Sequence, residues 1–385
     1  MRKKRNYSMQ AKGDKGGVRA VVYKVIFATN IFAILLLFSA YLSWKVSPLN
    51  SNLFSYIGLA YGYIILINFI YLLFWTLMSR WKLVLICTSS IILCYKPITT
   101  YFPIHITKTE APDKAIEVLT YNVQGFISEN KKTAKERPII NYIAETDADI
   151  VLLQEYLVSK TGQSIISQQD INRLLNKYPY RSVTALGSSG KYHIFGLACF
   201  SKFPIENTEE VVFESSYNGA SIYTINIGGE QYTVANVHLE TNNIKEEDKQ
   251  LYNDFLRNND SINLEAVTSN IRTRLGKSFR ARAVQVKKIK QTISNQETKG
   301  IIVGGDFNDT PISYAYHQMK RGLKDAYVST SFGPGFTYRQ DLFCFRIDHL
   351  MHSNNIKSYQ TQIDRLDYSD HYPLRTEFEL NASNN

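Results

Sequence analysis

The sequence predicts an α/β or α+β domain with a layered sheet core, preceded by a membrane region. After about Ala111, short apolar runs rich in β-branched residues alternate with amphipathic stretches, the pattern of strands and helices in one layered domain. Before that point, Val25–Trp44 and Leu53–Met78 are stretches of 20 and 26 residues without a charge. A helix that crosses a bilayer needs about 20 such residues.

The first 103 residues are expected to form a basic cytoplasmic tail (1–19) and a membrane anchor (20–103). The expected spans are residues 25–44, 53–78 and 82–102, about three transmembrane helices. The third is the weakest, because Lys96 and Pro97 interrupt it. A cleaved signal peptide is disfavoured for the first, since it is too long and a second apolar segment follows at once.

Charge in the short loops indicates the orientation of this anchor. The basic tail should stay inside, and so should loop 79–82, which carries Arg80 and Lys82. If the third segment spans the membrane, the domain at residues 111–385 lies outside the cytoplasm. If that segment lies flat in the interface, the domain is cytoplasmic. The first arrangement is expected, and it would suit a bacterial inner membrane.

The net charge of +10 is not a property of the globular domain. Residues 1–110 hold 13 basic and 2 acidic residues, whereas the remainder holds 31 basic and 32 acidic residues. A basic domain face is the usual mark of a nucleic-acid-binding protein, and net charge gives no such support here. The four cysteines show no CxxC spacing, so no structural zinc site is indicated. A Cys199–Cys344 disulfide and two buried free thiols both stay open.

The expected elements of the domain follow in order along the chain. Strands are expected at 116–123, 149–154, 196–201, 210–214, 221–227, 231–239, 300–304, 342–352 and 374–380. Helices are expected at 131–145 and through much of 242–296. Turn residues such as Gly228-Gly229 separate the strands, as in hairpins.

Polar residues recur where these apolar strands end. They are Asn122, Glu155, Asn236 and His238, Asp306 and Asn308, Asp348, and Asp370 with His371. Active sites assemble at such positions because a rigid scaffold fixes the side chains that the loops expose. Each residue alone has an ordinary structural explanation, such as a turn-forming Asn. Their joint occurrence in this order favours a site.

The set resembles the endonuclease/exonuclease/phosphatase superfamily, over about Ile116 to Leu380. The most specific segments are Gly305-Asp306-Phe307-Asn308, Asn236-Val237-His238-Leu239 and Ser369-Asp370-His371. Leu153-Gln154-Glu155 and Arg346-Ile347-Asp348-His349 add to them. The resemblance implies a deoxyribonuclease I-like, four-layer α/β/β/α sandwich with its site at one end of two packed sheets. It also implies a divalent-metal-dependent hydrolase of phosphate esters.

The resemblance further implies a role for each residue. The metal, Mg²⁺ with Mn²⁺ as an alternative, would be held by Glu155 with Asn122 and Asp370, since magnesium prefers oxygen ligands. His371 would be the general base and Asp348 its orienting carboxylate. Asp306 and Asn308 would position the attacking water and the phosphate, which His238 would contact or protonate. Asn236 and Arg282 are weaker candidates for substrate binding.

One departure narrows the resemblance. Abasic-site endonucleases have Asn-x-Asp in the first motif and Tyr where His238 stands, whereas this chain has Asn122-Val123-Gln124. It therefore looks more like the deoxyribonuclease I and sphingomyelinase branches, and a second metal contact from an Asp is in doubt.

The expected function is a membrane-anchored phosphoesterase that hydrolyses phosphodiesters or phosphomonoesters of a phospholipid or nucleotide. Alternatives are a nuclease for DNA or RNA, and a non-catalytic, membrane-tethered binding module. A transporter is disfavoured, because the spans carry almost no ionisable residues. No protein partner is indicated. The basic cluster at 272–282 would be either a phosphate or anionic-lipid contact or a solvated helix face.

Overall fold

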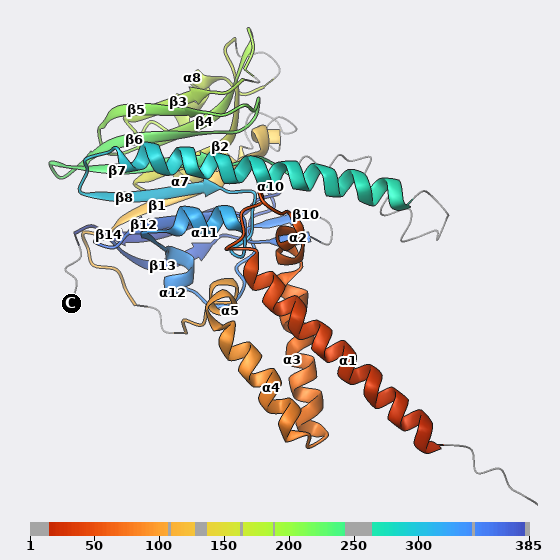
Figure 1. Ribbon diagram of the computed structural model, residues 1–385. Coiled ribbons are helices and arrows are strands. Elements are labelled where there is room, and N and C mark those ends of the chain that lie inside the picture. Colours follow the sequence, from red (N-terminus) through yellow and green to blue (C-terminus); the bar gives the residue numbers. More distant parts are fainter. Residues whose placement is uncertain are drawn as a thin grey trace, which may run out of the picture.

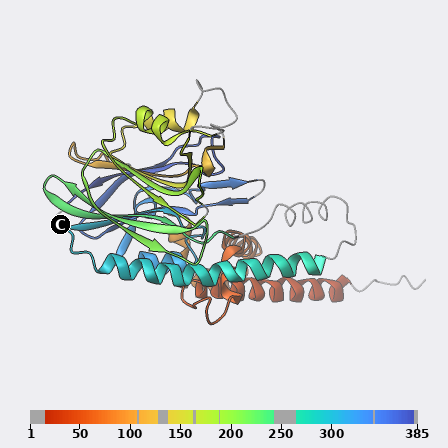
Figure 2. The same cartoon turned by 90° about the horizontal axis from the view of Figure 1, so that it is seen from above.

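The computed structural model describes residues 15–106, 109–127, 137–161, 165–187, 189–242, 264–340 and 343–381. A sandwich of two β-sheets carries a group of N-terminal helices that extends away from one side (Figure 1). Each sheet has six strands and mixed direction, and helices cover the outer faces (Figures 1 and 2).

The strand order places the central strands of both sheets next to parallel neighbours. The first sheet runs β13 (Lys357–Ile363), β14 (Leu374–Glu379), β1 (Ile116–Asn122), β2 (Ile150–Ser159), β4 (His193–Ser201), β3 (Tyr180–Ala185). The second runs β5 (Ile205–Val212), β6 (Gly219–Ile227), β7 (Glu230–His238), β8 (Gly300–Asp306), β12 (Asp348–Ser353), β9 (Leu323–Asp325). The pairs β1–β2 and β7–β8 are parallel, so their carboxyl ends lie at the same edge of the sandwich.

Three hydrophobic clusters define the layers. One lies between the first sheet and helices α7 (Pro138–Glu145) and α8 (Gln168–Leu174). The second lies between the other sheet and helices α10 (Leu264–Ser294) and α11 (Tyr314–Lys320). The third fills the space between the two sheets, beside α12 (Ala326–Thr330). This arrangement confirms the four-layer α/β/β/α sandwich that the resemblance implied.

The central strands form where both faces are apolar. Residues 150–153 of β2 are fully buried on both faces, because the central strand packs against helices on one side and the second sheet on the other. The expected strand at 342–352 was wrong as one element. It is divided into β11 (Phe343–Phe345), which pairs with β10 (Tyr338–Gln340), and β12. Between them, the Ile347 carbonyl accepts a hydrogen bond from the backbone of Phe307.

The structure describes only part of each expected helix. Helix α7 begins at Pro138 and α10 at Leu264, while residues 128–136 and 243–263 lie outside the described residues. Strand β13 and the short elements β3, β9 and β10 were not expected from the sequence. Cys87, Cys94, Cys199 and Cys344 are free thiols. The alternative of two buried free thiols therefore holds for Cys199, whereas Cys344 is only partly buried.

Within the described residues, one helix is long and apolar enough to cross a membrane by itself. It is Val18–Leu42, part of α1 (Lys15–Leu42). Helices α2 (Leu53–Leu59) and α3 (Tyr61–Leu77) meet at 68°, and α4 (Trp81–Leu93) and α5 (Tyr95–Tyr101) meet at 66°. The second and third expected spans are therefore bent pairs, and three spans are reached only if each pair counts as one. Helices α1, α3 and α4 extend away from the sandwich, whereas α2 and α5 lie against it (Figure 1).

Candidate active site

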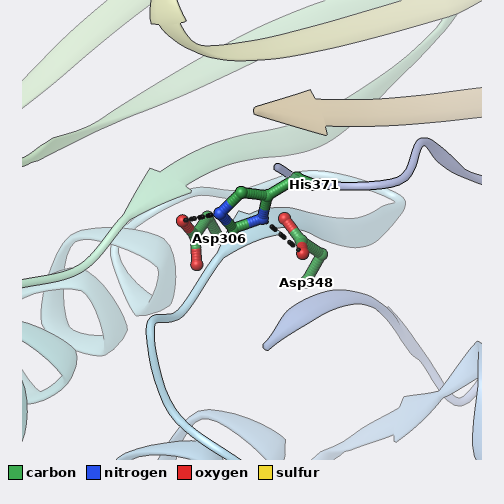
Figure 3. Close-up of side chains that lie close together, drawn as sticks. All are labelled: Asp306, Asp348 and His371. Carbon is green, nitrogen blue, oxygen red and sulfur yellow. Dashed lines mark hydrogen bonds and ion pairs between the residues drawn. The ribbon is translucent and has the colours of Figure 1, made fainter. Parts of the chain in front are cut away.

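The predicted residues converge at the edge of the sandwich where the parallel strands end. Asn122 and His238 are the last residues of β1 and β7, and Asp306 is the last residue of β8. Asp348 opens β12 and is the cross-strand partner of Asp306. His371 comes from the segment before β14 and lies between Asp306 and Asp348 (Figure 3).

His371 has a different carboxylate near each ring nitrogen. Its Nδ1–H donates to Asp348 Oδ2 at 2.9 Å, and its Nε2 lies 3.6 Å from Asp306 Oδ2. Burial alone would lower the pKa of His371, but the carboxylates of Asp348 and Asp306 outweigh burial and raise this pKa to about 10. The hydrogen bond fixes which nitrogen of the ring faces the centre of the site.

A tight turn after β8 holds Asp306 in place. The backbone N–H of Asn308 donates to Asp306 Oδ1 at 2.7 Å, and Asn308 has a φ of +51°. Asn is one of the few residue types that tolerate this left-handed conformation. The Asn308 amide also donates to the Leu239 carbonyl at 3.0 Å, which ties the turn to the end of β7. Burial raises the pKa of Asp306 to about 6.

Glu155 reaches the site because β2 is irregular there. The register between β2 and β4 shifts between Leu153 and Tyr156, and Glu155 has a φ of +51°, an unfavourable conformation for Glu that often marks functional positions. Asn122 Nδ2 donates to Glu155 Oε1 at 3.1 Å and to Asp306 Oδ2 at 3.0 Å. Asn122 thereby joins the two sheets through the site.

His238 presents a buried nitrogen to two acidic side chains. Its Nδ1 lies 3.1 Å from the Tyr217 carbonyl, which can only accept, so Nδ1 carries the proton of the neutral ring. Its Nε2 has no hydrogen-bond partner among the described residues. It lies 3.7 Å from both Glu155 Oε1 and Asp306 Oδ2. Burial lowers the pKa of His238, so three acceptor atoms face one another in its neutral form.

Converging acceptors of this kind fit a cation. Asp306, Asp348 and His371 form a buried cluster whose ligand atoms lie within 4.8 Å of one another, close enough to hold a metal ion. The Glu155 carboxylate lies beside them, with 28% of its side chain exposed, and burial raises its pKa. Carboxylate oxygens are hard donors and suit Mg²⁺ or a similar ion.

The other two residues predicted to hold a metal are placed less directly. The Asn122 carbonyl oxygen Oδ1 accepts from the backbone of Gln124 at 3.1 Å, and its amide group faces the site. Asp370 is half-buried, and Ser369 Oγ donates to its carboxylate at 3.3 Å. Its charge contributes to the raised pKa of Glu155, which places it close to the site. Roles as ligands for Asn122 and Asp370 stay predictions.

The two residues expected to bind substrate lie in the interior. Asn236 is fully buried between the sheets, and its amide donates to the carbonyls of Leu153 and Ala198. Arg282 is also fully buried and donates to Asp309 Oδ2 at 3.0 Å. It lies inside α10. The Asn236 amide and the Nε and Nη1 groups of Arg282 bond to protein partners, while Arg282 Nη2 has no partner among the described residues.

Two residues of the site had no signal in the sequence. Tyr217 contributes only its carbonyl, which any residue could supply. Tyr338 packs its ring edge-on to His371 with 5.0 Å between the ring centroids. It comes from the short strand β10, which no apolar run in the sequence predicts. Only a fold-level alignment of these segments could have found them.

Comparison with known proteins agrees with this geometry. The model of the Endonuclease/Exonuclease/phosphatase family matches residues 119–371, and a domain of unknown function matches residues 23–101. No curated protein matches the sequence.

Two solved structures illustrate the shared fold. An endonuclease/exonuclease/phosphatase family protein from Leptotrichia buccalis is 19% identical at a TM-score of 0.50, covering 69% of this chain and 100% of its own. The human Nocturnin catalytic domain with bound sulfate anion is 18% identical at a TM-score of 0.50, covering 71% and 96%. With the family model spanning most of the sandwich, the chain belongs to the endonuclease/exonuclease/phosphatase family and is a hydrolase acting on phosphate esters.

Proposed function

We propose that this protein is a membrane-anchored, divalent-metal-dependent phosphoesterase whose catalytic domain lies outside the cytoplasm. The observation that carries the proposal is the arrangement around His371, whose Nδ1 bonds to Asp348 and whose Nε2 faces Asp306. Glu155 and the unpartnered Nε2 of His238 face the same point. A divalent metal would supply the positive charge that these acceptor atoms lack, and the phosphate group of the substrate would bind beside it.

His371 is the proposed general base. Its Nδ1–H is held by Asp348 at 2.9 Å, so Nε2 is the nitrogen that would take a proton from the attacking water. Asp348 would stabilise the imidazolium that results. Asp306 lies 3.6 Å from the same Nε2, and with Asn308 it would orient the water towards phosphorus. The bond from phosphorus to the leaving oxygen breaks as the bond to water forms.

His238 is the proposed contact to the phosphate. Burial lowers its pKa, so the neutral ring prevails when the site holds no negative ligand. The charge of a phosphate, added to those of Glu155 and Asp306, favours the protonated ring, whose Nε2–H can then donate to a phosphate or leaving oxygen.

Glu155 is the proposed principal ligand for Mg²⁺, or alternatively Mn²⁺, with Asn122 and Asp370 beside it. When bound, the ion would neutralise phosphate charge. Its positive charge would also disfavour the protonated form of His371 and so lower the pKa of that base towards neutrality. The residues therefore fit the ion both as donors and through their charge.

The proposed orientation rests on where the basic residues lie in the anchor. Helices α2 and α5 lie against the sandwich, and the turn between α3 and α4 lies at the far end (Figure 1). That turn carries Arg80, which packs over the ring of Tyr23 at 5.5 Å. If each bent pair crosses once, the basic tail and the basic turn share one side and the catalytic domain occupies the other. The positive-inside rule then makes the far end cytoplasmic, as in a bacterial inner membrane.

The proposed substrate is a phosphodiester or phosphomonoester of a phospholipid or nucleotide, since the domain is held at a membrane. A nuclease is the second candidate. It is less favoured because residues 111–385 carry 31 basic and 32 acidic residues, whereas nucleic-acid binding draws on a basic surface.

The test is hydrolysis of bis(p-nitrophenyl) phosphate and p-nitrophenyl phosphate by the full chain in detergent, with Mg²⁺ or with a chelator. His371→Ala is the site variant, and His105→Ala, at an exposed position, is the matched control. Magnesium-dependent turnover that only His371→Ala abolishes supports the proposal and leads to a comparison of phospholipid, nucleotide and DNA. A folded, metal-binding protein without turnover on any of these would instead be a membrane-tethered binding module.

A further inference from the structure

The helical anchor contacts the same two segments that deliver Asp306 and Asp348 to the site. Helices α2 and α5 and the loop after α1 lie against the sandwich (Figure 1), and Tyr56 of α2 also donates a hydrogen bond to the Arg272 carbonyl of α10. The anchor is therefore packed on the catalytic domain as well as joined to it through the chain. Two of its contacts lead directly to catalytic strand ends.

The first contact is made by Arg346, two residues before Asp348. Arg346 is buried, with 2% of its surface exposed. One guanidinium nitrogen donates to the carbonyl of Thr100 in α5, and the other donates to the Pro334 carbonyl at 2.9 Å. The guanidinium also packs over the ring of Tyr327, 4.7 Å from its centroid. The planar fork of Arg suits two carbonyls at once, whereas Lys offers a single point charge.

The backbone that follows Arg346 is held at every residue. The N–H groups of Ile347 and Asp348 both lie 3.1 Å from Thr337 Oγ1. The carbonyl of Ile347 accepts from Phe307 N–H at 2.8 Å, next to Asp306. A shift of Arg346 is thus passed on within two residues to the carboxylate that orients His371.

The second contact is made by Ile312, six residues after Asp306. Its side chain is fully buried among helices of the anchor, against Leu37, Ala40, Tyr61, Ile64 and Cys94. The Ser43 hydroxyl lies 2.6 Å from the Ile312 carbonyl. This contact fixes the far end of the turn that begins at Asp306 and Asn308.

We propose that the anchor positions a residue of the active site. Arg346 is the positioning residue through which the anchor holds Asp348 against His371. Catalytic groups must be held to within about 0.5 Å of the productive geometry, and a displacement of about 1 Å can cost roughly 100-fold in rate. The anchor supplies this precision by tying the β8 turn and the start of β12 to one rigid group of helices. Only the kinetic consequence of this inference rests on the proposed function.

The test compares site-linked and unlinked anchor contacts in the full chain, purified in detergent. Arg346→Gln removes the fork to Thr100, and Ser43→Ala removes the hydroxyl beside Ile312. Tyr56→Phe is the matched control, because it removes a hydrogen bond across the same interface, from Tyr56 to the Arg272 carbonyl of α10 at 2.6 Å, and α10 carries neither Asp306 nor Asp348. Arg346→Lys tests for partial rescue.

We expect Arg346→Gln to lower kcat roughly 10- to 100-fold with KM nearly unchanged. Arg346→Lys should recover part of the loss, Ser43→Ala should show a smaller loss, and Tyr56→Phe should match the wild type. Hydrogen–deuterium exchange should rise in residues 346–350 for Arg346→Gln and stay unchanged for Tyr56→Phe.

Two results would overturn the inference. One is wild-type kcat and wild-type exchange in a folded Arg346→Gln protein, and the other is an equal loss in Tyr56→Phe. A wild-type protein without turnover on any phosphate ester would count against the proposed function instead. In that case the exchange measurement still decides whether the anchor orders the Asp348 segment.

Discussion

Asp348→Asn separates the charge of the orienting residue from its shape. Asp348 is fully buried, and its Oδ2 accepts from His371 Nδ1 at 2.9 Å. Its backbone N–H bonds to Thr337, so the substitution leaves the strand start in place. The change removes one negative charge beside His371 and weakens a charge-assisted hydrogen bond.

The expected magnitude follows from that bond. A hydrogen bond to a charged group contributes about 1.5–3 kcal/mol, and about 1.4 kcal/mol corresponds to tenfold in rate. Asp348→Asn should therefore lower kcat roughly 10- to 150-fold. If the introduced amide turns the imidazole into its other tautomer, the loss should approach roughly 10⁴-fold. The pKa of His371, which Asp348 helps to raise to about 10, should fall.

The assay is steady-state hydrolysis of bis(p-nitrophenyl) phosphate with Mg²⁺, together with NMR titration of His371 in the metal-free protein. Asp149→Asn is the matched control. That carboxylate also accepts a hydrogen bond, from the Glu117 N–H at 2.8 Å. Asp149, however, lies at the amino end of β2, whereas the site lies at the edge where β1 ends. Wild-type kcat and an unchanged His371 titration in Asp348→Asn would refute the reasoning.

Three further predictions follow from the site and its scaffold. Glu155→Gln keeps the volume of the side chain and removes its charge, so we expect Mg²⁺ affinity measured by calorimetry to fall roughly 10- to 100-fold; an unchanged affinity would exclude Glu155 as a ligand. The raised pKa of His371 stabilises the fold fully below pH 6.5, its ordinary value, and this stabilisation is lost as pH rises towards about 10. The thermal midpoint of the chelator-treated protein should fall over that window, and the fall should be smaller in His371→Asn, whereas equal slopes would argue against the shift. Gly305 has a φ of +143°, and a Cβ there would lie 1.9 Å from the Val237 carbonyl oxygen, so Gly305→Ala should destabilise the protein by about 3 kcal/mol or more in denaturant unfolding, while Gly228→Ala, with open space around its Cβ, should cost less.

The sequence by itself determined the layered α/β class and, through its resemblance to a family, predicted which residues form the candidate site. The apolar run that ends at Glu155 could only be a buried element, and parallel strands bring the residues at their carboxyl ends to one edge. Asp306, Asp348 and His371 were predicted together and lie together. The fold class depends on local periodicity and residue type, which the sequence states directly, whereas the candidate site depends also on motifs that resemble those of the family.

Only the tertiary structure decided how those residues are aimed and what supports them. Asn122 directs its amide group at Glu155 and Asp306, and Asn236 and Arg282 turn inward to buried partners. The two later apolar segments bend by 68° and 66°, and Arg346 reaches a carbonyl 246 residues away in the anchor. Side-chain direction and contacts between layers arise from packing between segments far apart in the chain, and a one-dimensional pattern carries no record of that packing.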